Sequence, residues 1–253
     1  MIGEILNLNI FSFMLIFARI GTALSIMPGF GSQFIQMRAR LGFAVAIAFV
    51  MTPVLAGRLP SAPASFPDLF LLLAAEMLVG AFFGTIMRIM LAALQTTGTL
   101  FAYFASMANA FIQDPISEQQ GSIIATFLGT MAITLLFISG FHHVMIRAVA
   151  ESYAVFVPGQ GVMIGDMADM TAKTVSTSFL LGVKMATPFM VVVVAYYLGL
   201  GMLGRLMPQM PVFFVGMPIQ IGLQVSVLII VMSSIMMLFL NNFNDSLMPL
   251  MVR

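Results

Sequence analysis

Long apolar stretches repeat along the whole chain, and they limit more than any other feature what this sequence can fold into. A helix needs about 20 apolar residues to cross a bilayer, with about 17 as the lower bound. Regions of this kind lie at about 5–26, 41–57, 69–113, 123–141, 175–204 and 212–240. No period-two alternation typical of strands competes with them. The sequence therefore predicts an all-α, integral membrane-type protein of about six long apolar helices.

The composition excludes most soluble functions. Hydrophobic residues make up 61% of the chain and charged residues 8%, whereas soluble domains carry roughly 25% charged residues. The net charge of +1 gives no reason to expect a nucleic-acid partner. Without cysteine there is no disulfide or thiol chemistry. No nucleotide-binding or nucleophile motif is present, so we expect a non-enzymatic protein without a cofactor or metal.

The aromatic residues are distributed unusually for a bilayer protein. The chain has 24 Phe, four Tyr and no Trp, although Trp and Tyr are enriched where membrane helices meet the headgroups. It also has 25 Met, a flexible side chain that packs well against irregular surfaces. Two interpretations stay open: ordinary compositional drift, or a surface that largely faces other protein chains.

Two of the apolar regions are too long for a simple span. Region 69–113 carries the sequence QTTGT at 95–99, where we expect a kink or turn. Region 212–240 must tilt, kink at Pro218 or extend beyond the membrane. Prolines disrupt helices, and we assign five residues to kinks or turns between and within the last two regions: Pro188, Pro208, Gln209, Pro211 and Pro218.

Small residues recur at a spacing of four. Gly80 with Gly84, Gly42 with Ala46 and Gly182 with Ala186 would let helix backbones approach closely. Packing within the chain is the simpler explanation, and contact with a partner helix is the alternative.

Four charged residues lie inside apolar regions, namely Arg19, Glu76, Arg88 and Lys184. Such groups are costly in hydrocarbon and face a partner, a cavity or the bundle interior. One hypothesis makes Glu76 and Lys184 the midplane site of a secondary transporter or small-molecule permease. The simpler hypothesis is that each charge pairs with another chain or reaches a helix end. His142 and His143 are adjacent rather than four apart, so a metal site is not expected there.

The stretch 104–122 changes from apolar to polar along its length. Pro115 biases Asp114 away from helix, and non-helical backbone at membrane depth is tolerated only when it is buried in protein or lines a cavity. An ordinary surface loop and a plug inside a pore are both consistent with this pattern.

The run from Leu180 to Gln224 resembles the C-terminal signature of the FliR family, a subunit of the flagellar type III export gate related to the SctT subunits of virulence systems. The matching residues are Lys184, Pro188, Gly201, Arg205, Pro208, Gln209, Val212, Phe213, Gly216 and Pro218. The segments 18–31 and 75–84 resemble the family as well, and the resemblance covers almost the entire chain. Residues 104–122 depart from it, since only Asp114 and Pro115 are typical there.

The resemblance implies a single domain of kinked helical hairpins, at about 1–104 and 123–253, on either side of a plug-like loop at about 105–122. It implies assembly with several copies of FliP and FliQ, with FlhB nearby, into a helical multi-subunit gate in the inner membrane, at the flagellar basal body. Unfolded flagellar proteins would pass through this gate. The plug or gate residues would be Met107, Asn109, Phe111, Ile112, Gln113, Asp114 and Pro115, and the subunit-contact charges Arg19, Glu76, Arg88, Lys184 and Arg205.

Overall fold

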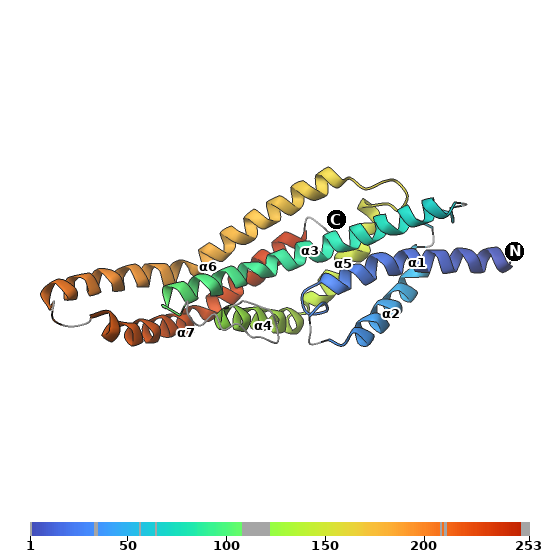
Figure 1. Ribbon diagram of the computed structural model, residues 1–253. Helices are drawn as coiled ribbons and strands as arrows, with labels where there is room; N and C mark the ends of the chain where they lie inside the picture. The colour runs from blue at the N-terminus through green and yellow to red at the C-terminus, as the bar shows by residue number, and fades with distance from the viewer. Residues whose placement is uncertain are drawn as a thin grey trace. The chain divides into compact units, whose positions relative to one another are not determined.

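The computed structural model describes residues 2–32, 35–55, 57–63, 65–107, 122–207, 209 and 212–248, with the side chains from Ile10 onward except those of Val212, Phe213 and Val215. All regular secondary structure in these ranges is helical (Figure 1). The helices are α1 (Ile2–Ile26), α2 (Met37–Leu55), α3 (Phe66–Phe104), α4 (Ile123–Ile138), α5 (Phe141–Val155), α6 (Ile164–Leu206) and α7 (Val212–Leu247). The all-α prediction is confirmed.

Within the described residues, four helices are long and apolar enough to cross a membrane: α2, α3, α6 and most of α7. The interrupted pair α4 and α5 would add a fifth span, and the apolar part of α1 is shorter, at Ile10–Ile26. Only 17% to 39% of the residues in the most apolar windows of the four helices are buried inside the chain. Most of this surface is therefore left for lipid or for other proteins.

The kink or turn expected at 95–99 is wrong, because α3 continues through this stretch to Phe104. The polar side chains there are satisfied by their own helix: the Thr97 hydroxyl donates to the Ala93 carbonyl at 2.9 Å, and the Thr99 hydroxyl donates to the Gln95 carbonyl at 2.8 Å. A threonine that bonds back to the preceding turn can stay in a helix, so the cluster QTTGT does not break it.

The region 123–141 also differs from its expected form. Helix α4 ends at Ile138, Gly140 adopts a left-handed conformation with φ of 76°, and α5 begins at Phe141. Glycine takes positive φ with little strain, so it permits this break between two apolar helices. Helix α5 buries one face, with Met145, Ala148 and Val149, and pairs exposed Arg147 with Glu151 at 2.6 Å.

The two longest helices at the C-terminal end contain prolines. Helix α6 begins at Ile164, earlier than the predicted 175, with Asp166 in its first turn, where a negative charge suits the helix dipole. Pro188 and Pro218 lie inside α6 and α7, which both continue past them. Helix α6 ends at Leu206 and α7 begins at Val212, and Gln209 between them lies in a turn. Pro208 and Pro211 lie outside the described residues.

The helices group into two compact units, each built from separate stretches of sequence. The first unit contains Met1–Met90, Leu136–Val175 and Phe243–Arg253. In it, α3 packs against α1 at two glycines: a Cβ added to Gly80 would lie 2.9 Å from the Arg19 carbonyl carbon, and one added to Gly84 would lie 2.9 Å from the Ala23 carbonyl oxygen. The Gly80–Gly84 pattern therefore serves packing within the chain.

The second unit contains Leu91–Leu135 and Ser176–Asn242. A Cβ at Gly182 of α6 would lie 2.8 Å from the Ala93 carbonyl oxygen of α3, so this small-residue pattern is also used internally. The rings of Phe101 and Phe189 meet edge to face nearby, with centroids 4.9 Å apart. Gly42, in the first unit, has open space where a Cβ would be.

Candidate functional site

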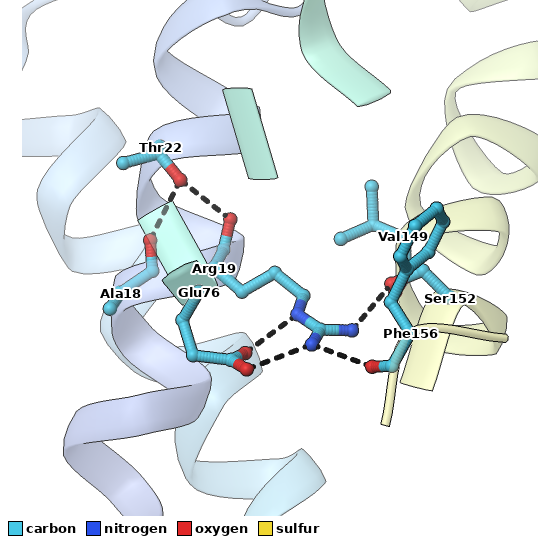
Figure 2. A network of polar contacts seen from close by, with 7 residues as sticks. All are labelled: Ala18, Arg19, Thr22, Glu76, Val149, Ser152 and Phe156. Carbon is cyan, nitrogen blue, oxygen red and sulfur yellow. Dashed lines mark hydrogen bonds and ion pairs between the residues drawn. The ribbon is translucent and has the colours of Figure 1, made fainter. Parts of the chain in front are cut away.

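A buried charge network joins three helices of the first unit (Figure 2). The Arg19 guanidinium of α1 donates from Nε to Glu76 Oε2 at 2.7 Å and from Nη2 to Glu76 Oε1 at 2.9 Å. Arg19 is 1% exposed and Glu76 of α3 is 2% exposed. The geometry is bidentate, the arrangement in which guanidinium and carboxylate groups interact most strongly.

The same guanidinium holds the end of α5. Arg19 Nη1 donates to the Ser152 hydroxyl at 3.0 Å, and Nη2 donates to the Phe156 carbonyl at 2.9 Å, just after α5 ends. The guanidinium carbon lies 3.9 Å from the centroid of the Tyr153 ring, which adds a cation–π contact. A positive charge at a helix C-terminus is also favourable for the helix dipole. Arg19 thereby connects α1, α3 and α5 at one point.

The network corrects the expectation that Arg19 and Glu76 are satisfied by a neighbouring subunit, because each finds its partner within this chain. Removing either charge would leave the other buried without compensation. Sequence reasoning missed that Ser152 and Tyr153 complete the network. The available signal was the polar pair Ser152–Tyr153, which directly follows Glu151.

A second polar cluster, in the other unit, holds the C-terminal end of α3. The helix ends in a Schellman motif: the Met107 N–H donates to the Ala102 carbonyl at 2.9 Å and the Ser106 N–H donates to the Tyr103 carbonyl at 3.2 Å. The left-handed position of this motif is usually glycine, yet Ser106 occupies it with φ of 55°. The chain is thus held in a strained turn immediately before the predicted plug.

Side chains from α6 and α7 support this turn. Gln220 of α7, 3% exposed, donates from Nε2 to the Phe104 carbonyl at 2.7 Å and contacts the Tyr197 hydroxyl at 3.3 Å. The Tyr197 hydroxyl lies 3.5 Å from the Ser106 hydroxyl. A helix end leaves its last carbonyls without helical partners, and Gln220 satisfies one of them. We call Ser106, Tyr197 and Gln220 the helix-end clasp.

A buried amide ties α7 to α6 one turn further along. Gln224 is fully buried and donates from Nε2 to the Phe189 carbonyl at 3.1 Å, next to Pro188. The Tyr196 hydroxyl donates to the Gly216 carbonyl at 2.5 Å. These two hydrogen bonds hold α6 and α7 together near Pro188 and Pro218, where we predicted kinks.

The predicted plug falls almost entirely outside the described residues. Asn109, Phe111, Ile112, Gln113, Asp114 and Pro115 all lie there. Met107 is described and half-buried, and its backbone N–H closes the Schellman motif.

The remaining predicted contact charges point away from the fold. Arg88, Lys184 and Arg205 are exposed, and no carboxylate of the described chain forms an ion pair with any of them. The structure therefore brings together two of the five predicted charges and leaves these three on the surface.

No cluster of three or more potential metal ligands occurs among the residues that the structure describes. The His142 ring instead stacks on Phe137, with centroids 5.1 Å apart and planes 7° apart. Both polar clusters have a structural role in holding helices together. Their donors and acceptors face one another, and neither cluster presents a nucleophile beside a base.

Comparison with known proteins agrees with this picture of a membrane-embedded, helical chain. Residues 10–246 match the family of bacterial export proteins, family 1. The flagellar biosynthetic protein FliR of Caulobacter vibrioides is 32% identical over 233 residues, covering 92% of this chain and 93% of that protein. FliR of Bacillus subtilis is 29% identical over 92% of this chain and 90% of that protein. The Yop proteins translocation protein T of Yersinia pestis is 23% identical over 91% of this chain and 89% of that protein.

The fold and its matches define a multi-pass membrane component of a bacterial type III export apparatus. The chain belongs to the bacterial export proteins, family 1, the family of the FliR proteins.

Proposed function

We propose that the chain is a structural and gating subunit of the flagellar export channel, which assembles with several copies of FliP and FliQ and with FlhB nearby. Unfolded flagellar proteins pass through the resulting pore in the inner membrane, at the basal body. The chain itself is non-enzymatic in this proposal, and the energy for export comes from other components.

The observation that carries the proposal is a lysine that has no ion-pair partner among the described residues, on a helix face that these residues leave uncovered. Lys184 is exposed on α6, among exposed apolar neighbours such as Leu180 and Val191. A lysine in such surroundings is expensive in lipid, but it is stable when a carboxylate of a neighbouring subunit covers it. The scarcity of Tyr and the absence of Trp support the same view, because a surface covered by protein needs no interfacial aromatic belt.

The assembly part of the proposal is tested by replacing Lys184. In Lys184→Ala, we expect the amount of FliP and FliQ that co-purifies with the tagged chain to fall at least about tenfold, which corresponds to about 1.4 kcal/mol. Lys173→Ala is the matched control, since Lys173 is also exposed on α6 but lies before its apolar part. Normal recovery of the complex together with failed export would instead favour a transporter-like role for Lys184.

The gating part of the proposal concerns residues 108–121, which lie outside the described residues. We propose that they contribute the plug, with Met107 at its start. Deleting 108–120, while keeping the clasp residue Ser106, should leave the complex with FliP and FliQ intact and make cells permeable to ions. Unchanged ion permeability in cells that contain the assembled complex would show that these residues do not form the plug.

A further inference from the structure

An open groove of about 720 Å³ runs between α1, α2 and α3 in the first unit. Its α1 wall is lined by small residues, Ala18, Gly21 and Ser25, and by Phe17. The opposite walls carry large apolar side chains that nothing in the described chain covers: Met37, Leu41, Met77 and Leu78, which are between 45% and 82% exposed. The groove therefore presents apolar surface that needs an occupant.

One end of the groove carries a positive charge. Arg40 of α2 lines it and is half-buried. Its Nε donates to the Phe30 carbonyl at 2.7 Å and its Nη2 donates to the Ser32 carbonyl at 2.9 Å. These bonds fix the guanidinium beside the loop that follows α1, and its charge is not neutralised by a carboxylate among the described residues.

The position of Arg40 along the helices corresponds to the headgroup level of a bilayer. It lies in the first turn of α2, a candidate span from Met37 to Leu55, and span ends lie where apolar core and headgroups meet. From this charged end the groove follows α1 back from Ile26 to Met14. Twelve residues of helix correspond to about 18 Å.

The layout of the groove favours an occupant with a long apolar part and one anionic end. An apolar path of about 18 Å runs from Arg40 along the small residues of α1. A phospholipid combines an extended acyl chain with a phosphate, and so has the same layout. A phosphate next to a fixed guanidinium is also a favourable pairing.

We propose that this groove binds one anionic phospholipid, with an acyl chain along Phe17, Ala18 and Gly21 and the phosphate on Arg40. The small side chains on α1 make room for the acyl chain. The lipid covers the apolar wall and neutralises the arginine, so a single molecule satisfies both features of the groove. This site is independent of the gating proposed for residues 108–121.

The absence of Trp from the chain allows a direct test with the full-length protein in vesicles. Phe17→Trp places one fluorophore in the groove, and Phe49→Trp places one on an exposed part of α2 that does not line it. The vesicles consist of phosphatidylcholine with a minor fraction of phosphatidylglycerol. Two preparations are compared: in one only the phosphatidylcholine has brominated acyl chains, which quench Trp fluorescence, and in the other only the phosphatidylglycerol has them. At Phe17→Trp, we expect quenching to show that phosphatidylglycerol binds beside the Trp about fivefold more strongly than phosphatidylcholine. This ratio follows from about 1 kcal/mol for one basic side chain near anionic lipid. At Phe49→Trp we expect no preference between the two lipids.

Two matched pairs of variants assign the effect to the groove. Arg40→Gln should remove the preference at Phe17→Trp, whereas Arg38→Gln, an exposed arginine on the same helix outside the groove, should keep it. Gly21→Leu should abolish quenching by filling the groove, since a Cβ there meets only the Phe17 ring at 3.8 Å. Gly42→Leu, at a position with open space and outside the groove, should not.

Three results would overturn the proposal. Equal quenching by both brominated lipids would show an unselective contact with bulk lipid. A preference that survives Arg40→Gln would exclude the phosphate site. Absence of quenching at Phe17→Trp by either lipid, combined with loss of FliP and FliQ recovery in Gly21→Leu, would identify a partner helix as the occupant.

Discussion

Arg19 and Glu76, 57 residues apart in the sequence, form two hydrogen bonds of 2.7 and 2.9 Å in the interior of the first unit. The pair fixes α1 against α3 at the position where Gly80 lets the two backbones approach. A charge that appears isolated in an apolar stretch of sequence is thus fully paired once the helices pack.

Replacing one member of this pair should be more damaging than replacing both. We expect Arg19→Met or Glu76→Met to lower the free energy of unfolding by about 3–5 kcal/mol, because each leaves an uncompensated buried charge. The double variant should lose much less than the sum of the two. Denaturant unfolding of the detergent-solubilised chain measures all three, with exposed Arg88→Met as the control. Additive losses would mean that the two charges act independently.

The close contact at Gly80 predicts a strong position effect for a small substitution. Gly80→Ala places a Cβ against the Arg19 backbone and the Thr22 side chain, whereas Gly42→Ala enters open space. Overpacking costs about 1–3 kcal/mol, so Gly80→Ala should lower the unfolding midpoint. Gly42→Ala should leave it unchanged or raise it slightly, since alanine favours helix. Similar midpoints for the two variants would contradict the α1–α3 contact.

Replacing Ser106 with glycine should stabilise the protein. It holds φ of 55° in the left-handed position of the Schellman motif, a conformation that costs an L-residue about 1–2 kcal/mol. We therefore expect Ser106→Gly to raise the free energy of unfolding by up to about 1 kcal/mol. Ser106→Ala separates the two roles of this residue, because it removes the hydroxyl and keeps the strain. A loss of stability in Ser106→Gly that matches the loss in Ser106→Ala would show that the hydroxyl contact with Tyr197 matters more than the backbone.

Gln220 should protect the end of α3. In Gln220→Leu the carbonyl of half-buried Phe104 loses its donor, and an unsatisfied acceptor costs up to about 1–3 kcal/mol when it is shielded from water. Amide hydrogen exchange of residues 103–107 should become faster by about tenfold or more, whereas Gln95→Leu, an exposed position on the same helix, should not change it. Unchanged protection in Gln220→Leu would show that the Schellman motif holds the helix end without the clasp.

Much of the helical layout could be predicted from the sequence. The apolar stretches predicted five of the eight ends of α2, α3, α6 and α7 to within four residues, because hydrophobicity over about 20 residues depends on local composition alone. The end of α3, the start of α6 and the end of α7 differ from the prediction by 9, 11 and 7 residues. The errors lie where local signals mislead. Thr97 and Thr99 look like a break but bond back to their own helix. Gly140 looks like one more small residue in a span but takes positive φ and ends α4.

The sites were predictable only as a set of unusual residues. Sequence marked Arg19, Glu76 and Lys184 alike as charges in apolar surroundings, since the cost of such a charge depends on the residue and its neighbours. It could not pair them, because pairing depends on helix rotation and register. The same limit applies to Gln220, which lies 116 residues from the carbonyl that it satisfies.

By itself, the sequence determined that this chain is an all-α membrane protein of the bacterial export family, because apolar length, missing charge and motif order are properties of the chain. Only the tertiary structure decided that Arg19 and Glu76 neutralise each other while Arg88 and Lys184 stay exposed. It also decided that Gly80 packs against the backbone of α1 while Gly42 has open space beside it. These outcomes depend on distances between segments far apart in sequence, and helix packing alone sets those distances.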